Sequence, residues 1–132
     1  ALRHLETEQY HHQRITEAMP PSTETHLLGL WKIMGWLTGA LPSLVGPHAV
    51  FATIEAVETF VDHHYQEQIV RLSEDGPFRG LRQLLLECQQ DEVAHRDEAA
   101  SLVVAKIGLL TRGWQWLVGI GSKGAVFIAR KI

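Results

Sequence analysis

Two long stretches of the chain carry apolar residues at helical spacing. Residues 48–73 and residues 78–107 each repeat an apolar side chain about every third or fourth position. This period places the apolar side chains on one face of a helix. The segment SEDGP (73–77) between them is rich in turn-forming residues. The pattern therefore predicts two long helices joined by a short turn.

The most apolar segment is LLGLWKIMGWLTGALPSLV (27–45), which Lys32, three glycines and Pro42 interrupt. Its length reaches the range in which a membrane-spanning helix has to be considered. The lysine and the helix-breaking residues argue against such a span. We interpret the segment as a bent apolar helix that is buried or lies in a membrane interface, with a true span as the less favoured alternative.

Two further helices are predicted at the ends of the chain. Residues 1–18 form the first, which ends before Pro20, and residues 114–131 form the last, after a break at 108–113. No segment alternates with the period of a strand. Long helices with short connections are typical of a bundle, so we expect one all-α domain over residues 1–132.

Charge is distributed unevenly along the 132 residues. The formal net charge is -3, which gives no basic field for nucleic acid. The last acid is Glu98, whereas five bases follow it. A basic, tryptophan-rich end suits an anionic membrane surface, or a packed helix whose bases reach the solvent; both interpretations stay open. The single cysteine, Cys88, excludes an intrachain disulfide and is expected to be a buried helix residue.

Candidate metal chemistry rests on a motif that occurs twice. Glu8 and His11 form one Glu-x-x-His, and Glu92 and His95 form another. Residues three apart share a helix face, so each pair is either a metal-ligand pair or an ordinary surface pair. Glu58 lies among apolar residues of a third helix, where an unpaired carboxylate is costly unless it binds a cation. Di-iron carboxylate bundles combine two Glu-x-x-His helices with two single-Glu helices.

Four sequence elements together resemble one family. TEQYHH, LWKIMGWLTGALPSLVG, AVETFVDHHYQEQI and DEVAHRDEA occur in the order and at the spacing of the demethoxyubiquinone hydroxylases, which are ferritin-like di-iron monooxygenases of ubiquinone biosynthesis. The resemblance implies an all-α, ferritin-like four-helix bundle with an additional apolar, membrane-associating helical segment. It also implies a site that binds two iron ions and contains Glu8, His11, Glu58, Glu92 and His95 as metal ligands and His64 and Tyr65 as catalytic residues.

Helix geometry limits the roles of several other residues. His64 lies six positions after Glu58, which favours a place beside the ligands, whereas Tyr65 shares a face with Glu58 and either lines the site or packs in the core. His4 and His12 are expected at the surface. The family's first ligand glutamate has no counterpart in this sequence. Because the first helix begins without a capping signal, we expect that a preceding helix carrying this glutamate is missing.

The resemblance implies a specific reaction and location. We expect hydroxylation of the ring of demethoxyubiquinol (2-polyprenyl-3-methyl-6-methoxy-benzoquinol), with O₂ as co-substrate and NADH or quinol as reductant. The expected location is peripheral, on the cytoplasmic face of a bacterial inner membrane or the matrix side of the mitochondrial inner membrane. A homo-oligomer or a lipid-binding accessory protein is a possible partner. Two alternatives stay open: a rubrerythrin-like or ferritin-like iron oxidase or peroxidase, and a non-catalytic helical protein that binds quinone or membrane.

Overall fold

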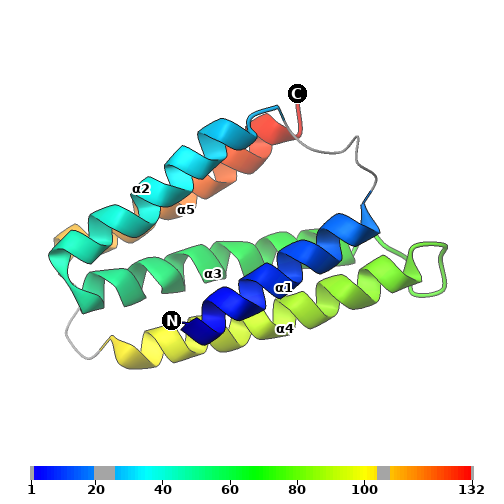
Figure 1. Cartoon of the computed structure of the whole chain (residues 1–132), viewed down its shortest axis with the longest axis horizontal. Coiled ribbons are helices and arrows are strands. Elements are labelled where there is room, and N and C mark those ends of the chain that lie inside the picture. The colour runs from blue at the N-terminus through cyan, green and yellow to red at the C-terminus, as the bar shows by residue number, and fades with distance from the viewer. Residues whose placement is uncertain (1, 20–25, 104–107, 132) are drawn as a thin grey trace.

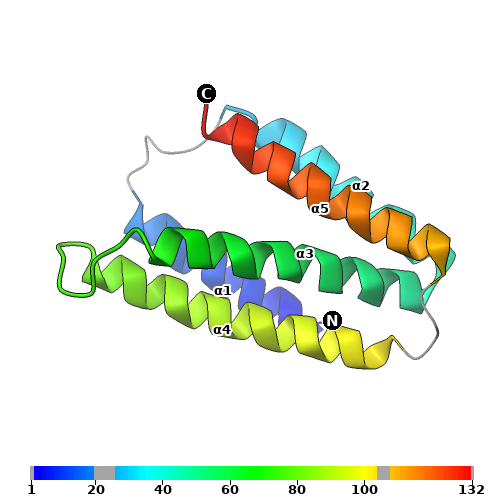
Figure 2. The ribbon, with the colours of Figure 1, turned by 180° about the vertical axis from the view of Figure 1, so that it is seen from behind.

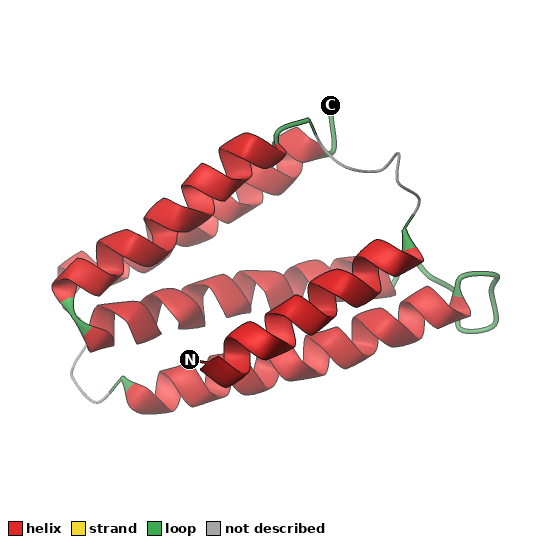
Figure 3. Cartoon of the chain, in the orientation of Figure 1, coloured by secondary structure: helices red, strands yellow, loops and turns green. Residues whose placement is uncertain are grey.

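The computed structural model describes residues 2–19, 26–103 and 108–131. Helices account for almost all of this part of the chain, which contains no strand (Figure 3). Its elements are α1 (Leu2–Ala18), α2 (Leu28–Val45), α3 (Pro47–Ile69), α4 (Arg79–Leu102) and α5 (Leu109–Ala129). Within the described ranges, the prediction of an all-α chain is therefore confirmed.

Helix α3 is the central element of the arrangement. It packs against α4, α5 and α2, whereas α1 packs against α4. In Figure 1, α1, α3 and α4 lie together in one half of the molecule, and α2 and α5 lie in the other half. The reverse view in Figure 2 shows the same division. Helix α3 therefore joins the two halves.

A glycine–proline pair makes the sharp turn between α2 and α3. Gly46 has a φ of 132°, a backbone conformation that is accessible to glycine because it lacks a Cβ atom. Pro47 begins α3, where the missing N–H group costs no intrahelical hydrogen bond. The predicted break at this pair is confirmed. The turn reverses the chain so that α3 packs against α2.

Three helix ends differ from the sequence-based prediction. Helix α5 begins at Leu109 rather than at residue 114, and its first turn closes with a 3.1 Å hydrogen bond from the Arg112 N–H to the Gly108 carbonyl. A helical glycine costs only about 1 kcal/mol, so Gly113 does not stop the helix. Helices α3 and α4 end earlier than predicted, at Ile69 and Leu102. Of the predicted extension of α4, residues 104–107 lie outside the described residues.

The α3–α4 interface is the best-buried part of the structure. Leu84, Leu85, Cys88 and Ala99 of α4 are buried, as expected for Cys88. Beside this apolar seam, Asp62 of α3 accepts hydrogen bonds from the Gln89 amide at 2.7 Å and the Arg96 guanidinium at 2.9 Å. These contacts fix the two helices in register.

Helices α2 and α5 bury much less of their apolar surface. Trp114 of α5 donates a 2.8 Å hydrogen bond from Nε1 to the hydroxyl of buried Thr53 on α3. Elsewhere α2 and α5 expose many large apolar side chains, including Leu44 at 84% and Leu110 at 91%. No helix within the described ranges has both the length and the apolar character that a membrane crossing requires.

Candidate metal centre

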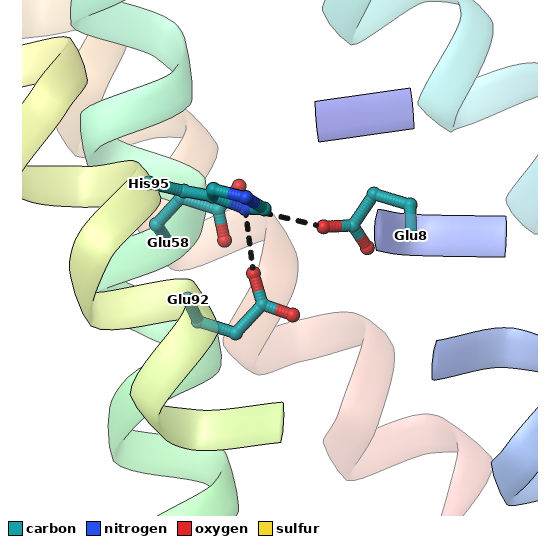
Figure 4. Close-up of side chains that lie close together, drawn as sticks. All are labelled: Glu8, Glu58, Glu92 and His95. Atoms are coloured by element: carbon teal, nitrogen blue, oxygen red, sulfur yellow. Dashed lines mark ion pairs between the residues drawn. The ribbon is translucent and has the colours of Figure 1, made fainter. Parts of the chain in front are cut away.

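Three helices bring four potential metal ligands to one point. Glu8 comes from α1, Glu58 from α3, and Glu92 and His95 from α4 (Figure 4). One ligand atom of each residue lies within 4.8 Å of the ligand atoms of the other three. Carboxylate oxygens combined with an imidazole suit iron or manganese. Tertiary packing therefore assembles a candidate cation site.

The second Glu-x-x-His motif forms the buried side of this site. Glu92 and His95 are 2% and 7% exposed, and their spacing puts both on the face of α4 that meets α3 and α1. Nδ1 of His95 lies 3.5 Å from Oε1 of Glu8 and 3.6 Å from Oε2 of Glu92. These distances bring the two carboxylates to the ligating side of the imidazole (Figure 4).

Two buried atoms of this pair lack a hydrogen-bond partner among the described residues. They are Oε2 of Glu92 and Nδ1 of His95. A buried polar atom without a partner costs about 1–3 kcal/mol, so it is rarely kept without a compensating interaction. A bound cation would satisfy both atoms at once. The residues present therefore fit a metal ion.

His11 lies on the other side of Glu92. Its side chain is buried, with Nδ1 at 3.2 Å from Oε1 of Glu92 and Nε2 at 3.0 Å from Oδ2 of Asp91. When Nε2–H donates to Asp91, the lone pair of Nδ1 faces Glu92. Glu92 thus lies close to the imidazoles of both His11 and His95. Asp91 is exposed and contacts His11.

The three carboxylates of the site have raised pKa values, and burial is the largest cause for each. Burial, followed by a hydrogen bond and charge repulsion from Glu58, raises the pKa of Glu92 from 4.5 to about 7. Burial also raises the pKa of Glu58, with a smaller contribution from the charge of Glu8. The pKa of Glu8 is raised by burial and then by Glu92. Burial therefore disfavours the charged form of all three carboxylates when no cation is bound.

Tyr65 lies beside the carboxylate site. Burial raises its pKa strongly, with further contributions from Cys88, to which it is hydrogen-bonded, and from the charge of Glu92. The phenol therefore stays protonated. Cys88, four residues before Glu92 on α4, was identified from the sequence as a buried residue but not as a neighbour of the site.

His64 has different surroundings. Its Nε2 lies 2.6 Å from the amide nitrogen of Gln68, and its ring stacks on Phe60 with centroids 5.8 Å apart. Burial lowers the pKa of His64, and the nearby Arg130 lowers it further. These contacts set His64 apart from the four-ligand cluster, and its catalytic role stays a prediction.

His4 is a neighbour of the site that the sequence did not reveal. It was expected at the surface, and this expectation was wrong, because the His4 side chain is only 18% exposed and stacks on His95. His12 was also expected at the surface, and it is exposed. The one sequence signal for His4 is its position four residues before Glu8, which puts both on the same face of α1.

A model of a known protein family matches almost the whole chain. The family model described as "Ubiquinone biosynthesis protein COQ7" matches residues 1–129. The chain belongs to this family. The resemblance identified from the sequence motifs is thereby confirmed. No solved structure gives a significant match.

Curated relatives of this COQ7-family chain are named as hydroxylases. It is 36% identical over 75 residues to a human NADPH-dependent 3-demethoxyubiquinone 3-hydroxylase, mitochondrial, covering 55% of this chain and 35% of the human protein. It is 27% identical to the Dictyostelium discoideum protein of the same name, covering 82% and 50%. A 3-demethoxyubiquinol 3-hydroxylase of Rhodospirillum rubrum is 36% identical, covering 54% and 33%. The chain thus spans between a third and a half of these relatives.

The raised pKa of Glu92 predicts how the stability of the metal-free protein depends on pH. A carboxyl group with a raised folded-state pKa contributes stability that is complete below its ordinary pKa of 4.5 and lost as the pH rises through about 7. Glu92→Gln should remove this loss, making the variant about 2 kcal/mol more stable than the unaltered protein near pH 8 and no more stable near pH 4. Thermal unfolding of both proteins in the presence of a chelator measures the difference.

A control and a metal addition complete this experiment. Glu87→Gln, at an exposed position of the same helix, should leave the pH dependence unchanged. Adding Mn²⁺ near pH 8 should raise the melting temperature of the unaltered protein more than that of Glu92→Gln. An equal pH dependence in the unaltered protein and Glu92→Gln would contradict the raised pKa of Glu92.

Proposed function

We propose that this chain carries the metal-binding part of an O₂-dependent di-iron monooxygenase that hydroxylates the ring of demethoxyubiquinol. One observation carries the proposal: Glu58 belongs both to the metal-ligand cluster and to the wall of a large apolar cavity. A cavity that ends at a metal ligand suits an apolar substrate that reacts at the metal. The names of the relatives point to the same substrate class.

The cavity has the size and lining of a small-molecule site. It encloses about 700 Å³ between α2, α3 and α5, within the range of about 300–1,000 Å³ that is usual for such sites. Its walls are mostly apolar, with Trp31, Val57 and Leu117 among them, and Glu58 is the only acidic lining residue in the part of the chain that the structure describes. A quinol ring near Glu58 would leave the prenyl tail against apolar side chains, where each buried CH₂ group gains about 0.8 kcal/mol.

We assign the metal ligands to Glu8, His11, Glu58, Glu92 and His95. Two iron ions bound there would supply the reduction and activation of O₂. Glu92 lies close to both imidazoles, so its carboxylate would help to hold the metal ions. Buried surroundings restrict the access of water to the reacting centre. In this assignment the fold is ferritin-like over residues 1–132, with α1, α3 and α4 as ligand-bearing helices and α2 as the additional apolar helix.

Around these ligands, other side chains orient the reactants and hold protons. Asp91 accepts a hydrogen bond from Nε2 of His11 and thereby fixes the orientation of the ring. The protonated phenol of Tyr65, close to Glu92, is available as a hydrogen-bond donor at the edge of the site. For the reductant, several relatives are named NADPH-dependent, which favours a pyridine nucleotide over the quinol itself.

We further propose that the apolar surface of α2 and α5 docks on a membrane. A substrate with a prenyl tail resides in the bilayer, and such a surface would shorten its path to the cavity. The exposed bases Arg112 and Lys123 of α5 would favour anionic lipids. We propose the inner membrane as the location, on its bacterial cytoplasmic face or its mitochondrial matrix side. The exposed apolar side chains are Leu28, Leu30, Ile33, Met34, Trp36, Leu41, Leu44 and Val45 of α2 and Leu109, Leu110, Trp116, Leu117, Ile120, Phe127 and Ile128 of α5.

Single-turnover hydroxylation tests the proposed reaction. The protein is loaded with Fe²⁺ without oxygen, given a short-chain demethoxyquinol, mixed with ¹⁸O₂, and the product is analysed by mass spectrometry. The unaltered protein should add one labelled oxygen atom to the ring. Glu58→Ala and His95→Ala should lower the rate more than about 100-fold, because loss of a mere supporting residue around a metal already costs about 10–100-fold.

Two exposed positions supply controls for this experiment. His12→Ala and Glu87→Ala should keep the iron content and rate of the unaltered protein. Full activity of Glu58→Ala or His95→Ala would refute the ligand assignment. Oxidation of Fe²⁺ without ring hydroxylation would indicate an iron oxidase or peroxidase instead, and quinol binding without iron would indicate a non-catalytic protein.

Filling the cavity should impair the reaction without disturbing the metal. Gly121 of α5 lines the cavity, and no heavy atom lies within 4 Å of the position that a Cβ atom would take. Gly121→Leu should raise the KM for a prenylated quinol roughly 10- to 100-fold, because the new side chain takes the place of several substrate carbons. Iron content should stay the same, as measured by elemental analysis.

Gly124 of the same helix gives a matched control. It has equally open surroundings but does not line the cavity, so Gly124→Leu should leave KM unchanged. Both substitutions replace a helical glycine and raise helix propensity alike. An unchanged KM in Gly121→Leu would show that the quinol does not occupy this cavity.

Vesicle binding tests the membrane surface. Trp36 and Trp116 are 69% and 67% exposed on α2 and α5. The double variant Trp36→Ala/Trp116→Ala should bind anionic lipid vesicles about tenfold more weakly, because both rings would lose interfacial contacts. Tyr10→Ala, at an aromatic position of α1 that is 52% exposed, should bind normally in the same co-sedimentation assay. Unchanged binding of the double variant would contradict the proposal, and self-association without lipid would favour a homo-oligomer.

A further inference from the structure

The imidazole of His95 lies against a second imidazole. The rings of His95 and His4 are nearly parallel, with an interplanar angle of 19° and centroids 4.0 Å apart. Nε2 of His4 lies 3.0 Å from Oε2 of Glu98. His4 lies one helical turn before Glu8 on α1, and Glu98 lies one turn after His95 on α4. His4 and Glu98 therefore lie next to the ligand cluster, on the side of His95.

The two candidate histidine ligands are oriented in different ways. The ring of His11 is held by the hydrogen bond from Nε2 to Asp91, the usual means of fixing a ligating imidazole. For His95, the described part of the chain provides no hydrogen bond to Nε2. The stacked ring of His4 is instead the contact that restricts rotation of the His95 ring.

We propose that His4 and Glu98 are a positioning pair for His95. Glu98 fixes the imidazole of His4, and His4 fixes the ring plane of His95, so that Nδ1 points toward Glu8 and Glu92. His4 is not itself one of the four clustered ligands, and its Nε2 is engaged by Glu98. It therefore acts through His95. This inference rests on the metal site of the proposed function and adds two residues to it.

Cobalt binding to the purified protein tests the pair without requiring catalysis. Co²⁺ affinity is measured by titration calorimetry, and the coordination of the ion by its ligand-field absorption spectrum. His4→Ala should weaken binding about 10- to 100-fold, the usual effect of losing a residue that orients a metal ligand. It should also change the spectrum, because the imidazole of His95 would no longer have a fixed orientation.

Further variants separate positioning from a merely structural role. His4→Phe keeps a flat ring against His95 and should restore most of the affinity and the spectrum. Glu98→Ala should weaken binding less than His4→Ala, and adding it to His4→Ala should have no further effect, since Glu98 acts through His4. His12→Ala, at an exposed position of the same helix, is the matched control and should bind Co²⁺ normally.

The outcomes distinguish this inference from the proposed metal site. No Co²⁺ binding by the unaltered protein would overturn both. Normal binding by the unaltered protein together with unchanged affinity in His4→Ala would overturn the positioning pair alone. Hydrogen exchange of the metal-free variants is measured in parallel, because weaker binding in His4→Ala that is fully explained by loss of α1 protection would also overturn it.

Discussion

Three carboxylates from three helices share one partly dehydrated space, and the structure depends on how their charge is balanced. For Glu8, Glu58 and Glu92, burial is the largest cause of a raised pKa, and repulsion among the three adds to it. Three adjacent anions are unstable in such surroundings, so a proton or a cation has to neutralise them. Because the carboxylates belong to α1, α3 and α4, the neutralising charge also joins these helices.

The helices differ in how much they depend on that charge. Helices α3 and α4 pack through a buried apolar seam and the hydrogen bonds of Asp62. Helix α1 meets α4 through polar pairs instead: His11 with Asp91 and Glu92, and His4 with Glu98. The α3–α4 pair is therefore the scaffold, and α1 attaches to it through the ligands and their supports. Cation binding and docking of α1 are thus expected to be linked.

Helix α3 connects the metal centre to the apolar half of the molecule. Along its length, Asp62 contacts α4, Glu58 faces the ligand cluster, and Thr53 holds Trp114 of α5. The cavity between α2, α3 and α5 therefore has the rigid helix of the scaffold as one wall. The same helix carries the candidate ligand Glu58 and lines the cavity, so the two proposed binding sites share one structural element.

The sequence by itself determined the helices, the turn at Gly46 and the Glu-x-x-His pairs, because these features depend on local periodicity and backbone preference. Where the sequence-based prediction was wrong, local signals were weak or contacts were distant. The free-energy cost of a helical glycine at position 113 was too small to move the start of α5 beyond it. The partly buried stacking of His4 depends on α4, to which it is joined through Glu98, 94 positions away. Only the tertiary structure decided which carboxylates meet, which imidazole supports another and where the cavity ends, because these contacts form between helices whose packing no local pattern specifies.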